Sequence, residues 1–108
     1  MPVQMLIINF KFNMSPADYI HMVKPLVPEV LNAPGLRWKI WLLNEPECKA
    51  GGLYLFDDAE HVQLFLASEI MNKFRSHSAF TDFYITSFDL LESQTKATHG
   101  PLGFGVKV

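Results

Sequence analysis

Residues 36–56 read LRWKIWLLNEPECKAGGLYLF and decide the fold of this chain. The segments Leu36–Leu43 and Gly51–Phe56 are dominated by aromatic and aliphatic residues, as strands are, and the polar residues between them are typical of a hairpin loop. Successive side chains of a strand point to opposite faces, so Trp38 and Trp41 face opposite ways, each with apolar residues beside it. A sheet with one wet face would alternate apolar with polar residues. This stretch therefore predicts a sheet that is covered on both faces.

Two further segments have the composition of strands. Val3–Phe12 (VQMLIINFKF) ends at Asn13, a turn-forming residue, and Thr81–Leu91 reads TDFYITSFDLL. Both carry apolar residues at odd and at even positions, as the hairpin does. All four predicted strands therefore have two apolar faces.

Two helices are expected between these strands. Ser15, followed by a proline, is typical of a helix start, and Pro25 and Pro28 predict a kink or an early break because each removes a backbone donor. Asp57 or Asp58 caps a second helix of about four turns. Its apolar stripe has helical spacing and consists of Val62, Phe65, Leu66, Ile70 and Phe74.

The order of the elements is β-α-β-β-α-β. In a small domain this order predicts an α+β fold, a ferredoxin-like sandwich with both helices on one face of an antiparallel sheet. We place this domain at residues 1–92. Residues 93–108 form a glycine-containing C-terminal tail without a clear helical period, and its contact with a partner subunit is left open.

The second apolar face of the sheet needs a cover of its own, because two short helices shield only one side. An exposed patch of that extent is unusual on a soluble monomer. We therefore expect a homodimer in which two sheets pack together around a two-fold axis and close a dimeric α+β barrel. The alternative is a curled sheet covered by the C-terminal tail.

Composition excludes several classes of partner. The chain has 108 residues, a formal net charge of -2 and nine Lys and Arg without a run, so neither nucleic acid nor an anionic membrane is expected as a partner. No apolar run is long enough to cross a bilayer. The single cysteine, Cys48, cannot form an internal disulfide, and we expect a cytoplasmic protein.

Two motifs in the hairpin resemble the YdhR family of monooxygenases. They are Pro-Gly-x-x-Trp-Lys-x-Trp at residues 34–41 and Gly-Gly-x-Tyr-Leu-Phe-Asp-Asp at residues 51–58, and Lys24-Pro25-Leu26 fits as well. The likeness covers roughly residues 3–92. It implies a dimeric α+β barrel and oxygen chemistry without a metal or a flavin, so no cofactor is expected.

Four residues are candidates for a substrate pocket. Trp38 and Tyr54, on adjacent strands, suit a pocket that holds a flat ring, and Asn9 could orient a substrate oxygen. Arg37, with Lys39, could hold an anionic group. The competing interpretations are core packing for the aromatic residues and, for the two cations, edge-strand charges that discourage wrong pairing. No residue is singled out as catalytic.

A metal site is not expected, because no histidine stands beside a second ligand at metal-binding spacing. The leading functional hypothesis is a cofactor-independent monooxygenase acting on a small or polycyclic phenol or quinol in a pocket between sheet and helices. The first alternative is a non-oxygenase dimeric barrel that binds a small apolar metabolite. The second is a purely structural dimer whose cavity is filled by side chains.

Overall fold

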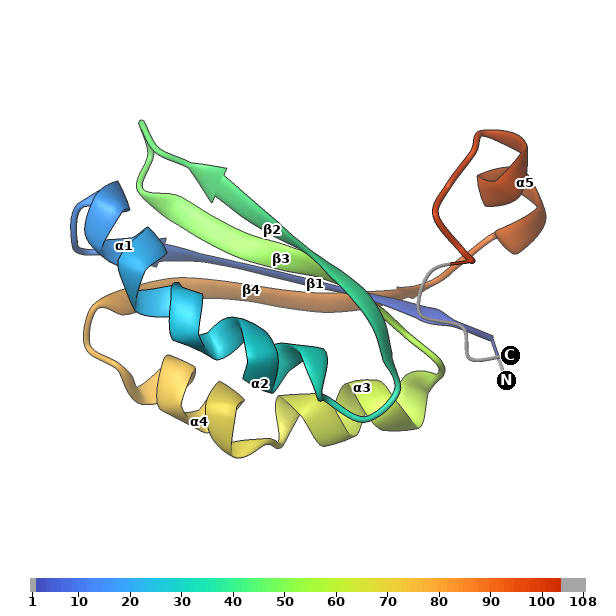
Figure 1. The fold of residues 1–108 in the computed structure, drawn as a ribbon, viewed down its shortest axis with the longest axis horizontal. Helices are drawn as coiled ribbons and strands as arrows, with labels where there is room; N and C mark the ends of the chain where they lie inside the picture. The colour runs from blue at the N-terminus through green and yellow to red at the C-terminus, as the bar shows by residue number, and fades with distance from the viewer. Residues whose placement is uncertain (1, 104–108) are drawn as a thin grey trace.

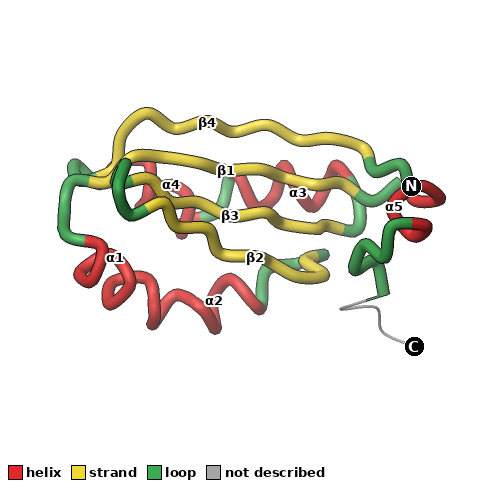
Figure 2. Tube along the Cα trace, turned by 90° about the horizontal axis from the view of Figure 1, so that it is seen from above, coloured by secondary structure: helices red, strands yellow, loops and turns green. Residues whose placement is uncertain are grey.

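Four antiparallel strands form one sheet in the computed structural model, which describes residues 2–103 (Figure 1). In sheet order they are β2-β3-β1-β4 (Figure 2), which is the order of a ferredoxin-like sandwich. The predicted α+β class and antiparallel sheet are confirmed. The strand bounds are β1 (Gln4–Phe12), β2 (Leu36–Asn44), β3 (Lys49–Phe56) and β4 (Phe80–Asp89).

The first helical segment is interrupted where the prolines predict it. It consists of α1 (Pro16–Val23), a 3₁₀ helix η1 (Lys24–Leu26) and α2 (Val27–Leu31). The Ser15 hydroxyl caps α1 by accepting a hydrogen bond from the Asp18 amide at 3.1 Å. The predicted kink is confirmed.

The second helical segment is two helices and not the single four-turn helix that the sequence predicts. These are α3 (Ala59–Leu66) and α4 (Glu69–Ser76). Asp58, one of the two candidate caps, accepts from the His61 amide at 2.9 Å, and this bond lowers the pKa of its carboxyl. Ser68 then caps α4 by accepting from the Met71 amide at 3.4 Å, so the chain turns between two short helices. No helix within residues 2–103 is long and apolar enough to span a bilayer.

Helices α1 to α4 cover one face of the sheet, which we call the inner face (Figure 1). The even-numbered residues of β1 and β3 point to it, because β1 pairs with β3 in a register that opposes Leu6 to Tyr54. Aromatic rings dominate the core there: Phe10 packs on Phe80 with centroids 5.1 Å apart, and Tyr54 on Phe65 at 5.0 Å.

The opposite side of the sheet, the outer face, is only partly covered. Ile40, Tyr84 and Phe88 are 44%, 54% and 52% exposed. The tail forms a short helix, α5 (Glu92–Ala97), and buries Leu102 at one end of this face. The tail therefore covers an end of the outer face and not its middle. Residues 104–108 of the predicted tail lie outside the described residues.

Candidate functional site: a cavity between the sheet and the helices

A narrow cavity lies between the inner face and the helical layer. Its volume is about 20 Å³, room for about one water molecule. The helices contribute only apolar side chains, from Leu26, Val30, Phe65, Ile70, Met71 and Phe74. The side chains from the sheet that line it are Ile8, Phe10, Lys39, Trp41, Tyr54 and Phe83. The polar side-chain atoms at its wall therefore come from three neighbouring residues of the hairpin.

Lys39, Trp41 and Tyr54 meet because of the hairpin register. Lys39 of β2 lies opposite Tyr54 of β3, and Trp41 lies opposite Gly52. The Lys39 ammonium nitrogen lies 3.3 Å from the centroid of the Trp41 ring and 4.5 Å from that of Tyr54. The lysine is thus held across two aromatic faces at the cavity wall.

Gly52 leaves the space that the lysine uses. A Cβ on this residue would lie 2.6 Å from Lys39 Cε and 3.3 Å from the Tyr54 ring. Its neighbour Gly51 has a different reason, because a Cβ there would lie 1.9 Å from the Ile8 carbonyl oxygen of β1. Both glycines sit inside β3, which begins at Lys49. The pair thus allows close packing of β3 against its two neighbouring strands.

Burial sets the protonation of the two polar groups. It lowers the pKa of Lys39 to about 7, while the two rings attract the ammonium and offset part of that effect. Burial, followed by the charge of Tyr19, raises the pKa of Tyr54, which therefore stays neutral. Among the described residues no carboxylate forms an ion pair with Lys39. The cavity thus holds a titrating amine beside a neutral phenol.

Of the four residues that the sequence analysis predicts for a substrate pocket, Tyr54 alone lines this cavity. Trp38 lies on the outer face, where its indole N–H donates to the Pro101 carbonyl at 2.7 Å. Asn9 borders a wide depression of the outer face together with Leu42. The expectation that Trp38, Asn9 and Tyr54 share a pocket is corrected, because they lie on opposite sides of the sheet.

The two cations of the hairpin, Arg37 and Lys39, also lie in different places. The pairing of β2 with β3 is irregular between Leu36 and Trp38, and Arg37 Nε donates to Asp57 Oδ1 at 2.8 Å instead of reaching the cavity. For Lys39, which the sequence analysis names together with Arg37 as a possible holder of an anionic group, an edge-strand charge was the favoured interpretation, and the structure places this residue at the cavity wall. The available signal was its position two residues before Trp41, which places both side chains on one face.

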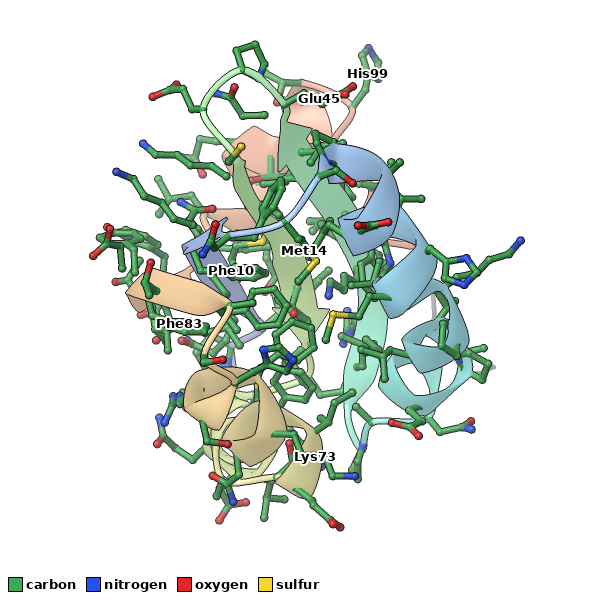
Figure 3. All side chains as sticks on the ribbon, turned by 90° about the vertical axis from the view of Figure 1, so that its left-hand side faces the viewer. Phe10, Met14, Glu45, Lys73, Phe83 and His99 are labelled. Carbon is green, nitrogen blue, oxygen red and sulfur yellow. The ribbon has the colours of Figure 1, made fainter. Side chains whose placement is uncertain are left out.

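A second depression adjoins the cavity. It has a volume of about 240 Å³, and Leu26, Ile70 and Phe74 line both it and the cavity. Its other residues include Glu29, Lys73 and His77. Figure 3 views this end of the molecule, with Lys73 on α4 and with Phe10 and Phe83 side by side on neighbouring strands. Three apolar side chains therefore separate the cavity from solvent here.

Potential metal ligands do not gather at this site or elsewhere in the described part of the chain. Within residues 2–103 no group of three or more His, Cys, Asp or Glu side chains could hold a metal ion together. The chemistry of the cavity wall is that of an amine, an indole N–H and a phenol.

Comparison with known proteins identifies relatives of this chain. Residues 5–101 match the model of a family described as "Putative mono-oxygenase ydhR". Among curated protein sequences, none matches at a significant level. The family match supports an oxygenase-like function and leaves the substrate unspecified.

Solved structures share the fold at low sequence identity. Protein NE2512 of unknown function from Nitrosomonas europaea has a TM-score of 0.71 at 18% identity, covering 84% of this chain and 91% of its own. Protein SO0527 from Shewanella oneidensis has a TM-score of 0.69 at 11% identity, with 82% and 91% covered. A variant of SnoaB, a cofactor-independent oxygenase from Streptomyces nogalater, has a TM-score of 0.67 at 12% identity, with 84% and 95% covered.

Proposed function

The chain belongs to the ydhR family of mono-oxygenases, and we propose that it oxidises a small or polycyclic phenol or quinol with molecular oxygen, without a metal or a flavin. The observation that carries the proposal is the apolar cavity with Lys39, Trp41 and Tyr54 at its wall. The likeness of the fold to a cofactor-independent oxygenase supports it. The architecture alone would not, because one fold hosts many activities.

The reaction requires little from the protein other than a site that excludes water and fits the aromatic substrate. A deprotonated phenol is electron-rich enough to give electrons to oxygen itself. One oxygen atom replaces ring hydrogen as a carbonyl and the other leaves as water, so that no external reductant is needed. The apolar wall keeps bulk water from the reactive carbanion-like ring, and the neutral Tyr54 hydroxyl is a hydrogen-bond donor for a substrate oxygen.

An aromatic substrate must widen the cavity on entry, since the present volume suits about one water molecule. Leu26, Ile70 and Phe74 are the side chains that separate the cavity from the second depression. Binding therefore includes rotation of these side chains. A purely structural protein would not open in this way.

The decisive measurement is oxygen uptake with a panel of phenols and quinols. We expect turnover by the wild-type protein and a decrease of roughly tenfold or more in the Tyr54→Phe variant, which loses one hydrogen bond to the reacting oxygen. Asn9→Ala is the matched control, because Asn9 lies on the outer face and its loss should leave uptake unchanged. If phenols bind and raise the melting temperature but no oxygen is consumed, the protein is a binder of apolar metabolites. If none binds, the structural alternative holds.

The quaternary state is part of the proposal. We propose a homodimer formed through the outer face, because Ile40, Tyr84 and Phe88 are exposed there beside other apolar residues. Light scattering at micromolar concentration should give twice the monomer mass, and Phe88→Glu should shift it toward the monomer. A wild-type protein that is monomeric throughout this range would contradict the dimer without affecting the cavity.

A further inference from the structure

Lys39 has no protein anion to pair with at the cavity wall. It is the one cation among the side chains that line the cavity, and the described residues place no carboxylate there. Its amine lies against Trp41 and Tyr54, and Gly52 leaves the room that this placement needs. A partly buried cation without a counter-ion is unfavourable unless an anion from outside completes the site.

We propose that the Lys39 amine accepts the hydroxyl proton of a bound phenol and holds the resulting aryloxide as an ion pair inside the cavity. The O–H bond of the phenol breaks, and an N–H bond forms on Lys39. No other reactant is required. This inference takes its ligand class from the proposed function, but it concerns proton transfer and not the oxygen step.

The electrostatics of the site favour this transfer. Burial lowers the pKa of Lys39 to about 7, so a large part of the amine is neutral and able to accept a proton near neutral pH. An aryloxide beside the new ammonium offsets the cost of burying it, and the ammonium in turn stabilises the aryloxide. Each charge therefore makes the other one stable in the apolar cavity.

Other titratable groups around the cavity do not compete for this role. Tyr54 shares the wall, and burial raises its pKa, so it donates a hydrogen bond without losing its proton. Tyr19 behaves likewise, with a pKa raised to about 12 by burial. Glu29, Lys73 and His77 border the second depression and not the cavity itself.

The first test uses 4-nitrophenol, whose aryloxide absorbs visible light while the neutral phenol does not. The apparent pKa of the bound phenol is read from absorbance under anaerobic conditions at saturating protein. In the wild-type protein and in the control Lys49→Met we expect it to lie about one unit or more below that of the free phenol, a tenfold shift toward the aryloxide. In Lys39→Met, which keeps an unbranched apolar side chain, we expect it at or above the free value. An equal pKa in wild type and Lys39→Met, or a wild-type protein that binds no aryloxide, overturns the inference.

The second test separates proton acceptance from charge attraction alone. Calorimetry with 2-naphthol at about pH 8, in buffers of different ionisation enthalpy, counts the protons released on binding. The wild-type protein should release almost none, because the proton moves to Lys39. Lys39→Arg should release about one, because arginine is already protonated. Release of a whole proton by the wild-type protein overturns the assignment of Lys39 as acceptor. Oxygen uptake is not read in either experiment, so a failure of the oxygenase proposal remains distinguishable.

Discussion

The inner and outer faces of the sheet have similar sequences and different surroundings. On the inner face Phe56 is completely buried, and the aromatic residues around it pack under the helices. On the outer face Phe88 is 52% exposed within a single chain. Each face also carries a polar exception, Lys39 inside and Asn9 outside. Apolar content therefore does not distinguish the covered face from the exposed one, whereas Lys39, a polar residue on the inner face of the hairpin, lies at the cavity.

The largest expected effect contrasts two phenylalanines, one from each face. Phe56→Ala should lower the free energy of unfolding by about 3–5 kcal/mol, because it leaves a cavity in the closed core. Phe88→Ala should cost less than about 1 kcal/mol in the monomer, since the ring is half in water. Urea denaturation at a protein concentration below the dissociation constant of the proposed dimer gives both values. Equal losses would mean that the outer face is as closed as the inner one in each chain.

The neighbouring glycines of β3 differ in what a new side chain would meet, a rigid backbone atom at Gly51 and a flexible side chain at Gly52. Gly51→Ala should destabilise the fold by about 3 kcal/mol or more, because the new methyl group meets the rigid Ile8 carbonyl. Gly52→Ala should cost clearly less, since its main obstacle is the flexible end of Lys39. It should instead displace the amine from Trp41, which tryptophan fluorescence can report. A Gly52→Ala protein that is as unstable as Gly51→Ala would contradict the role given to the lysine.

Lys39 also predicts a dependence of stability on pH that an exposed lysine would not produce. Its pKa is lowered from 10.5 to about 7 in the folded chain, so between these values the unfolded chain binds more protons and the free energy of unfolding rises with pH. We expect a rise of roughly 1–3 kcal/mol from about pH 7 to about pH 9.5. Below about pH 7 the contribution of this group no longer changes.

The matched variants for this prediction are Lys39→Met and Lys49→Met. Lys39→Met should remove the rise and be more stable than the wild-type protein at about pH 7, because it removes a charge that is partly withdrawn from water. Lys49 is exposed, so Lys49→Met should keep the wild-type slope. Above about pH 10 the buried tyrosines act in the opposite direction, because they stay protonated in the folded chain while those of the unfolded chain ionise. A slope that survives in Lys39→Met would show that the amine is solvated.

The fold was more predictable than the site for physical reasons. Strand composition, the Ser15 cap and the two prolines are local signals, and they predict the element order and the interrupted first helix. The break at Ser68 was missed because the apolar stripe of the second helical segment continues across it. A stripe reports which side is buried, and a cap in its middle is needed to show that the backbone turns.

The site depends on strand pairing, which no local pattern specifies. Trp38 and Tyr54 lie on adjacent strands, yet the register places Lys39 and not Trp38 on the face of Tyr54. The irregular pairing before Trp38 turns Arg37 toward Asp57 as well. The parity of Lys39 and Trp41 was visible in the sequence, but burial of the amine follows from Gly52 and from the helices above it.

The smallest expected effect concerns the one end of the outer face that the chain covers itself. Trp38→Phe keeps an aromatic ring against Leu102 but removes the indole N–H that donates to Pro101. Such a bond contributes about 1 kcal/mol, and its loss should open the tail locally without unfolding the sheet. Hydrogen exchange at the Leu102 amide, which bonds to the Gly100 carbonyl at 2.9 Å, should then accelerate about fivefold or more, while amides of β1 keep their rates. Trp41→Phe, on the inner face, is the control and should leave this amide unchanged. Unaltered exchange in Trp38→Phe would mean that apolar contact alone holds the tail against this end of the outer face.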